Sequence, residues 1–167
     1  TPFVLEQLAI FNAKASFFCI GKNVQLYPNI YAALIEANHT VGNHSQNHMN
    51  GWKNNTSDYI VDIQEATKSI SSNLFRPPYG RISFSQIKAL RSDPSLPQEI
   101  IMWDVLSGDF DTTISGDQCA QNVIQHAGPG SIIVFHDSEK AFPNLKYALP
   151  ETLKYFSEQG YRFEVIP

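Results

Sequence analysis

Three features of the sequence predict an α/β fold with a mostly parallel sheet in a single domain of residues 1–167. Short apolar runs alternate with segments of helical periodicity. Runs such as residues 131–135 are continuously apolar, which is typical of strands that are buried on both faces of a parallel sheet. The 167 residues, of which 43% are hydrophobic and 17% charged, suit one hydrophobic core, and no linker or repeat divides them.

The first half of the chain alternates between predicted helices and strands. Pro2 opens a helix, because proline is favoured at the first helical position. The Pro77-Pro78 pair ends the last strand of this half in a loop. After the first helix, the pattern predicts a strand at 15–20, a helix at about 28–37, a strand at 40–41, a helix at about 57–71 and a strand at 74–75.

The second half continues the same alternation. Gly128 and Gly160 each close a predicted helix, since glycine favours the position just after a helix end. The pattern predicts helices at about 83–91, 117–126 and 145–159, and strands at 100–105, 131–135 and 161–166. The whole chain therefore has six candidate strands separated by helices.

Composition excludes several classes of function. The net charge is −4 and the twelve Lys and Arg residues are scattered, so no basic surface for nucleic acid is expected. No apolar run approaches the roughly 18–20 residues of a membrane span. The sequence contains no export signal, but such a signal is removed from exported proteins, so export is not excluded. Two cysteines imply no disulfide framework, and we expect buried free thiols that do not fix the compartment.

Polar residues that can take part in catalysis or metal binding follow the predicted strands. His44 comes just after the strand at 40–41, and Arg76 directly follows the next strand. Asp109 comes soon after the fourth strand, and His136 directly follows the fifth. Active groups of parallel α/β folds gather at the carboxyl ends of strands, where the loops converge. We therefore expect these four groups to meet in one cleft.

His44 and His48 are four residues apart, which in a helical turn places both imidazoles on one side, at a separation that suits one metal ion. Two solvated loop histidines are the alternative interpretation, and the position after a strand favours metal ligands. A catalytic zinc ion usually has three protein ligands and an open position. A third donor is therefore needed, and this pair does not supply it.

The other three groups have roles that their chemistry suggests. His136 can act as a general acid or base, since an imidazole is easily poised near neutral pH, but a structural histidine is the alternative. Asp109 either orients that imidazole or only forms a turn beside Gly108. Arg76 stands before two prolines, so its guanidinium can hold a catalytic carboxylate rigidly or form a surface ion pair.

Four segments, in their order along the chain, resemble a known family. They are NHSQNH at 43–48, RPPYG at 76–80, SGDF at 107–110 and VFHD at 134–137. Together they are similar to motifs two to five of the polysaccharide deacetylases, also called the NodB-homology domain or carbohydrate esterase family 4. The resemblance spans essentially the whole chain, and the H-[ST]-x-x-H and R-P-P-Y-G pieces at this separation are together specific.

The resemblance implies a distorted (β/α)7-type barrel of mostly parallel strands that carries a metal-dependent hydrolase. It implies removal of acetyl groups from N-acetylated sugars of a polysaccharide, such as peptidoglycan or a chitin-like polymer, outside the cytoplasm or in the cell envelope. An O-acetyl esterase on xylan-type polymers is an alternative, because the motifs do not separate amide from ester. A non-catalytic glycan-binding or scaffold protein is another.

The resemblance also implies roles for individual residues around a divalent metal ion, most often Zn²⁺. His44 and His48 would bind the metal, which would polarise the acetamide carbonyl and activate water. The backbone N–H of Tyr79 would share in stabilising the oxyanion.

The remaining implied roles concern proton transfer and the acetyl pocket. His136 would protonate the leaving amine, Asp109 would orient it, and Arg76 would hold the catalytic base. Phe110 and Val134 would line the wall that receives the acetyl methyl group. They stand where the family usually has tryptophan and leucine, and both keep the wall apolar.

The first family motif, T-F-D-D-G, does not occur in this sequence. In the family it carries the catalytic base and the third metal ligand, which are the two roles left unfilled above. We infer that the first barrel strand, which carries this motif, is missing from the chain, with natural loss of the motif as the rival interpretation. On this basis the chain alone is expected to bind metal weakly and to be close to inactive.

Overall fold

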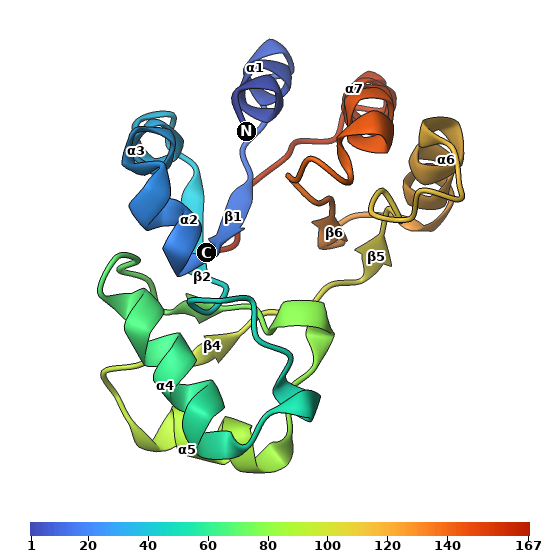
Figure 1. The fold of residues 1–167 in the computed structure, drawn as a ribbon. Helices are drawn as coiled ribbons and strands as arrows, with labels where there is room; N and C mark the ends of the chain where they lie inside the picture. Colours follow the sequence, from blue (N-terminus) through green and yellow to red (C-terminus); the bar gives the residue numbers. More distant parts are fainter. The chain divides into compact units, whose positions relative to one another are not determined.

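The computed structural model describes all residues 1–167 and divides into two compact units (Figure 1). The four-stranded unit comprises Ser16–Met102 together with Ile166. The two-stranded unit comprises Thr1–Ala15, Trp103–Val165 and Pro167. Each unit has its own strands, helices and buried core.

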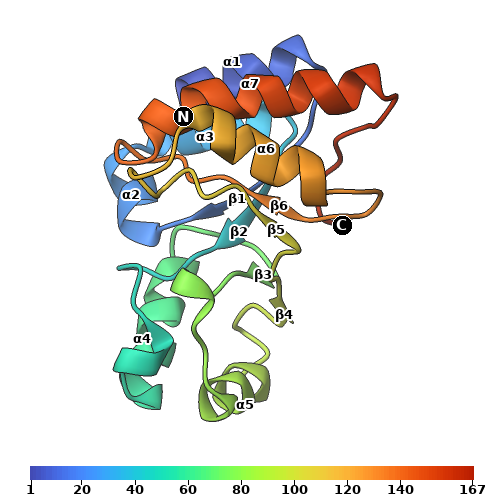
Figure 2. The same ribbon diagram turned by 90° about the vertical axis from the view of Figure 1, so that its right-hand side faces the viewer.

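The four-stranded unit is a parallel sheet with the strand order β1-β2-β3-β4. The helices α4 and α5 lie side by side in this unit (Figures 1 and 2). In chain order its elements are β1 (Ser16–Cys19), α2 (Gly21–Leu26), α3 (Pro28–Glu36), β2 (Thr40–Asn43), the 3₁₀ turn η1 (Gly51–Lys53), α4 (Thr56–Thr67), β3 (Leu74–Phe75), the 3₁₀ turn η2 (Pro78–Gly80), α5 (Phe84–Ser92) and β4 (Glu99–Ile100).

The two-stranded unit pairs two short strands in parallel, with Val105 opposite Ile133 and Leu106 opposite Val134. Figure 2 shows α6 and α7 lying along one another. In chain order the elements are α1 (Pro2–Ile10), β5 (Val105–Leu106), α6 (Gly116–His126), β6 (Ile133–Val134) and α7 (Phe142–Glu158).

The topology confirms the prediction of an α/β fold with parallel strands. Every strand pair in both sheets is parallel, and each connection between neighbouring strands of a sheet contains at least one helix. The four-stranded sheet keeps strict sequence order, whereas an open doubly wound sheet reverses its strand order near the middle. Sequential order is the arrangement that strands of a (β/α) barrel have.

Each sheet is covered by the helices of its own unit. In the four-stranded unit, Tyr59 and Ile63 of α4, Phe75 of β3 and Leu90 of α5 are completely buried in one cluster. In the two-stranded unit, side chains of β5, α6 and the end of α7 form another buried cluster. Burial of these apolar surfaces is the main source of stability, and it fixes the strand ends from which the polar residues project.

Two predicted strands differ in the structure. The run at 100–105 divides into β4 and β5, which belong to different sheets. Between them, the carbonyl groups of Ile101 and Met102 accept hydrogen bonds from the Arg76 guanidinium, so they are not available to a neighbouring strand. The segment at 161–166 is not a strand. The N–H of Ile166 donates to the side-chain oxygen of Ser16 instead of to a backbone carbonyl.

Other features agree with the sequence or add to it. The cysteines are both free, Cys119 buried and Cys19 partly buried, as predicted for a chain without a disulfide framework. None of the helices combines the length and apolar composition that a membrane span requires. The short helix α2 and the turns η1 and η2 were not predicted from the sequence pattern.

Candidate functional site

His44 and His48 lie together in the loop that follows β2, in the four-stranded unit. The centroids of their imidazole rings are 4.9 Å apart. The predicted helical turn is wrong, because residues 44–48 form a loop in which Ser45 has φ 61° and His48 has φ 58°. Positive φ is incompatible with a right-handed helix. The loop itself therefore brings the two histidines together.

The hydrogen bond of His44 to a backbone carbonyl indicates its tautomer. Its Nδ1 lies 2.6 Å from the backbone carbonyl oxygen of Arg76. Because a carbonyl only accepts, Nδ1 carries the proton, and Nε2 is left as the nitrogen with a lone pair. Metal-binding histidines commonly donate their second ring N–H to a carbonyl or carboxylate in this way.

The His44–His48 loop is fastened to α4 by buried polar groups. Asn43 is fully buried, and its side chain donates to the carbonyl of Ile63 and accepts from the N–H of Ser45. The carboxylate of Asp62, only 6% exposed, accepts from the backbone N–H of Asn47 at 3.1 Å and from the Asn47 side-chain amide at 2.7 Å. These bonds hold a loop with strained dihedrals in one conformation.

Arg76 follows β3 and is almost completely buried. Its Nε donates to the carbonyl of Ile101 and its Nη2 to that of Met102, at 3.2 and 3.0 Å. The guanidinium lies 4.0 Å above the ring of Phe18. Burial lowers the pKa of Arg76 to about 10, since the charged form loses hydration. The side chain is thus held in a fixed position, with the carbonyl groups of Ile101 and Met102 among its partners.

Tyr79 stands in η2 beside the histidine loop. Its ring centroid is 4.6 Å from that of His48. Its φ is 59°, an unusual value for a residue with a side chain. The N–H groups of Gly80 and Arg81 make the hydrogen bonds of this turn, to Pro77 and Pro78, and the N–H of Tyr79 is not among the donors.

His136 and Asp109 form a second group, in the two-stranded unit. The Nδ1 of His136 donates to Oδ1 of Asp109 at 2.7 Å, and its backbone N–H donates to Oδ2 at 2.6 Å. Asp109 is fully buried, whereas the side chain of His136 is 41% exposed. The arrangement places the proton of the neutral imidazole on Nδ1, so that Nε2 is the nitrogen suited to exchange a proton with a bound molecule.

The turn that carries Asp109 is supported from α7 and lined by an aromatic ring. The Asn144 side chain donates to the backbone carbonyls of Asp109 and Asp111. The ring of Phe110 meets that of His136 edge-on at a centroid distance of 5.0 Å. Val134, at the end of β6, is buried.

The predicted site residues therefore fall into two groups. The four-stranded unit brings together His44, His48, Arg76 and Tyr79, and the two-stranded unit brings together Asp109, His136 and Phe110, with Val134 two residues before His136. No third histidine, cysteine or carboxylate joins His44 and His48 within the four-stranded unit.

Two supporting residues were missed in the sequence. Asp62 lies in a predicted helix, where a lone carboxylate usually faces solvent. Asn144 precedes a predicted helix, where an asparagine is usually interpreted as a helix cap. Only the tertiary structure shows that their partners are loops that carry candidate site residues.

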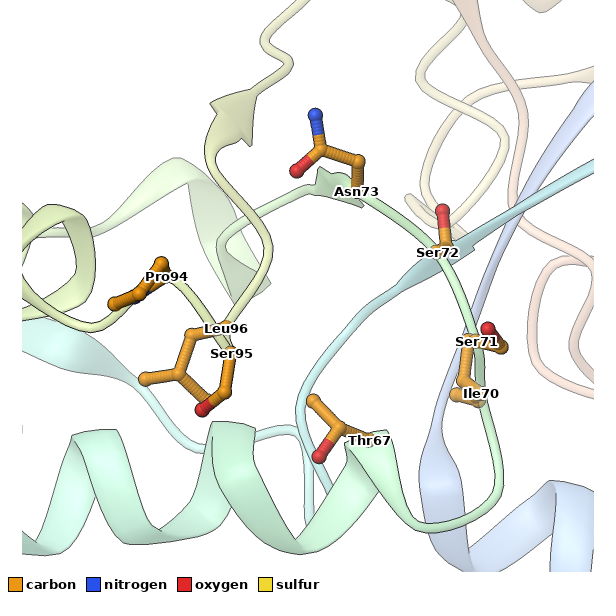
Figure 3. A pocket seen from close by; sticks show the side chains of 8 residues that line it. All are labelled: Thr67, Ile70, Ser71, Ser72, Asn73, Pro94, Ser95 and Leu96. Carbon is orange, nitrogen blue, oxygen red and sulfur yellow. The ribbon is translucent and has the colours of Figure 1, made fainter.

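A hollow in the four-stranded unit lies away from His44 and Arg76. It has a volume of about 520 Å³ and lies at the amino ends of β3 and β4, opposite to the strand ends that carry His44 and Arg76 (Figure 3). Polar groups along it are bonded within the protein: Asn73 binds Glu99 and Gln98, and Ser72 accepts from the N–H of Leu74. We therefore place the candidate site at the carboxyl ends of the strands. The residues around the hollow are Thr67, Ile70, Ser71, Ser72, Asn73, Pro94, Ser95 and Leu96.

The structure has the arrangement that is typical of α/β enzymes: parallel strands with polar residues at their carboxyl ends. Comparison with known proteins gives the particular family. The family model described as "Polysaccharide deacetylase" matches residues 1–94, which is more than half of the chain. The chain therefore belongs to the polysaccharide deacetylase family.

Known relatives agree in sequence and in fold. A peptidoglycan-N-acetylglucosamine deacetylase of Bacillus cereus is 30% identical over 174 residues, an alignment that covers 100% of this chain and 62% of that protein. The crystal structure of the Bc1960 peptidoglycan N-acetylglucosamine deacetylase has a TM-score of 0.89 and 28% identity, covering 99% of this chain and 79% of the other. BA3943 of Bacillus anthracis, a family 4 carbohydrate esterase pseudoenzyme, has a TM-score of 0.80 and 26% identity, covering 99% and 58%.

Proposed function

We propose that this protein is a zinc-dependent hydrolase that removes acetyl groups from N-acetylated sugars of a polysaccharide, with peptidoglycan as the first candidate. One observation carries the proposal: the imidazole rings of His44 and His48 lie 4.9 Å apart, and the Nδ1–H of His44 donates to the Arg76 carbonyl, as in metal-binding histidines that ligate through Nε2. The names of the relatives support the substrate class.

Two histidine side chains are suitable ligands for a zinc ion, both in the type of donor atom and in their number. Imidazole nitrogen is a preferred zinc ligand, and catalytic sites combine two or three histidines with a carboxylate or water. His44 and His48 would be two of the ligands. When bound, zinc polarises the acetyl carbonyl and lowers the pKa of water.

The residues of this chain have separate tasks in the proposed reaction. The N–H of Tyr79 would donate to the carbonyl oxygen as negative charge develops on it. His136, when protonated on both ring nitrogens, would deliver the Nε2 proton to the leaving amine, since the Asp109 carboxylate accepts from Nδ1–H. Phe110 and Val134 would bound the space for the methyl group, and Arg76 would hold the carboxylate that acts as base.

Acetate release from N-acetylglucosamine oligomers and from peptidoglycan tests the proposal. Because the chain alone is expected to be close to inactive, we expect slow release that depends on zinc, stops on chelation and returns when zinc is added. Acetylated xylan in parallel decides between amide and ester substrates. Absence of acetate from the N-acetylated substrates in the presence of zinc would overturn the proposal.

A non-catalytic glycan-binding protein is the second candidate function. It is favoured by the absence of a third ligand side chain beside His44 and His48 in their unit, together with the likeness to BA3943, a protein described as a pseudoenzyme. Binding of the same oligomers without acetate release, in the presence of zinc, would support this candidate.

Asp62 provides a test of the metal site that does not depend on activity. Replacing Asp62 with alanine removes both acceptors of Asn47 and loosens the loop between the two histidines. We expect the zinc affinity to fall roughly 10- to 100-fold, the usual effect of losing a group that orients metal ligands. Competition with a chromophoric chelator measures it. Glu65→Gln is the matched control, because Glu65 is on the same helix but pairs with Lys68. Unchanged zinc affinity in the folded Asp62→Ala protein would contradict the assignment.

A further inference from the structure

Two chain segments of the four-stranded unit run side by side away from the candidate metal ligands. The first follows His48 and the second follows Tyr79. They touch at His48 and Tyr79, and again at Trp52 and Arg81, where the guanidinium lies 4.0 Å above the indole ring. Between these contacts the backbones are close, since a Cβ atom placed on Gly51 would lie 2.3 Å from the carbonyl oxygen of Arg81. Tyr79, Trp52 and Arg81 therefore lie along the same pair of segments, and we call these three residues the aromatic strip.

The strip is exposed but its backbone is fixed. The side chains of Trp52 and Tyr79 are 64% and 60% exposed. The N–H of Trp52 donates to the side chain of Asn50, and the indole N–H lies 3.4 Å from the carbonyl of Ile82. The buried side chain of Gln86 donates to the carbonyls of Gly51 and Asn54. An exposed tryptophan held in place in this way is ready to bind without further loss of conformational entropy.

The chemistry of the strip matches a sugar ring. The face of an indole or phenol ring carries partial negative charge, and it attracts the C–H bonds on the face of a pyranose. A guanidinium provides up to five N–H donors, which suit ring hydroxyl groups and acetamide carbonyls. A nucleic acid would need a basic surface, whereas this chain has a net charge of −4 and no run of basic residues.

We propose that the aromatic strip binds a pyranose ring of the same glycan strand, next to the sugar whose acetyl group is removed. The position of that second sugar rests on the proposed function, because it is defined relative to His48 and Tyr79. Trp52 stacks on the ring, and Arg81 holds the indole and contacts the polar groups of the sugar. The strip therefore makes the protein select polymers over single sugars.

Calorimetric titration with the N-acetylglucosamine tetramer and with the monomer tests this proposal, with zinc in every sample. In Trp52→Ala, tetramer binding is expected to weaken by about five- to tenfold, the range that one aromatic stacking contact supplies, while monomer binding stays the same. Trp52→Phe keeps most of the affinity, because it retains a ring. Tyr27→Ala is the matched control, since Tyr27 is 58% exposed and lies between α2 and α3.

Tryptophan fluorescence locates the bound tetramer independently of affinity. The chain contains two tryptophans, Trp52 and Trp103. The tetramer is expected to change the emission of the parent protein and of Trp103→Phe, and to leave that of Trp52→Phe unchanged. An emission change that survives in Trp52→Phe and disappears in Trp103→Phe overturns the proposal.

The two measurements separate this proposal from the proposed function. Tetramer binding that requires Trp52, in a protein that releases no acetate, supports the strip and overturns the deacetylase. Acetate release from the tetramer with equal tetramer affinity in the parent and in Trp52→Ala supports the deacetylase and overturns the strip. Failure of the parent protein to bind the tetramer also overturns the strip.

Discussion

Replacing His44 and His48 together with alanine is expected to abolish zinc binding and, with it, acetate release. The two rings are 4.9 Å apart in a loop that buried hydrogen bonds hold to α4. Each imidazole provides one nitrogen to the metal, and removing both leaves no histidine at this position of the sheet. Elemental analysis of the purified protein after dialysis against zinc measures the loss.

The control for this experiment is another histidine of the chain. His126 lies at the end of α6, is exposed, and has its Nδ1 2.8 Å from the carbonyl oxygen of Asn122. His126→Ala is therefore expected to keep both the zinc and the activity of the parent protein. Zinc that stays bound to the double variant at the level of the parent would show that the metal is held elsewhere.

Local signals were enough to predict most of the helices. Ser83 and Ser115 each cap a helix in a reciprocal arrangement with a glutamine three residues later, and α5 and α6 begin directly after them. The helix predicted at 83–91 differs from α5 by one residue at each end, and the helix predicted at 117–126 differs from α6 by one residue at its start. These starts depend on residues that are near in sequence, so the sequence pattern contains them.

The strands were harder to predict because their ends depend on distant residues. Nothing within residues 100–105 shows that the run divides, since the Arg76 guanidinium, which binds the carbonyls at 101 and 102, comes from the end of another strand. Likewise, the apolar pattern at 161–166 suits a strand, but its end meets the hydroxyl of Ser16. Strand formation requires a partner, and the sequence pattern does not contain the partner.

The sequence predicted the residues of the candidate site, but it did not predict the residues that hold them in place. The spacing of His44 and His48 predicted their proximity, yet the helical turn assumed for it was wrong, because two positive φ angles shape the loop. Pairing of Asp109 with His136, 27 residues apart, was one of two interpretations of the residues and was implied by the family resemblance, and the two side chains are in contact in the structure. Asp62 and Asn144 act through bonds to other segments, which no local pattern reveals.

The pairing of Asp109 with His136 has a geometry that one isosteric change should disrupt. Both carboxylate oxygens accept a hydrogen bond from the same residue, one from Nδ1 and one from the backbone N–H. A carboxamide has a single accepting oxygen, so in Asp109→Asn an NH₂ group must face one of these two donors. If it faces Nδ1, the doubly protonated imidazole that donates from Nε2 loses the acceptor that stabilises its Nδ1–H. If it faces the backbone, the strand end that positions the ring is displaced.

We therefore expect Asp109→Asn to lower the turnover number for acetate release by roughly 10²–10⁴-fold, the range for loss of general acid–base catalysis, with a much smaller change in KM. Zinc content should equal that of the parent, because His44 and His48 are untouched. Steady-state kinetics on the N-acetylglucosamine tetramer separates the two constants, and urea unfolding shows whether the variant remains folded. Asp111→Asn is the matched control. The exposed carboxylate of Asp111 accepts hydrogen bonds from the backbone N–H and the hydroxyl group of Thr113, in the same turn. A folded Asp109→Asn protein with the turnover of the parent would show that His136 does not need this carboxylate, and that the proton reaches the leaving amine from another group.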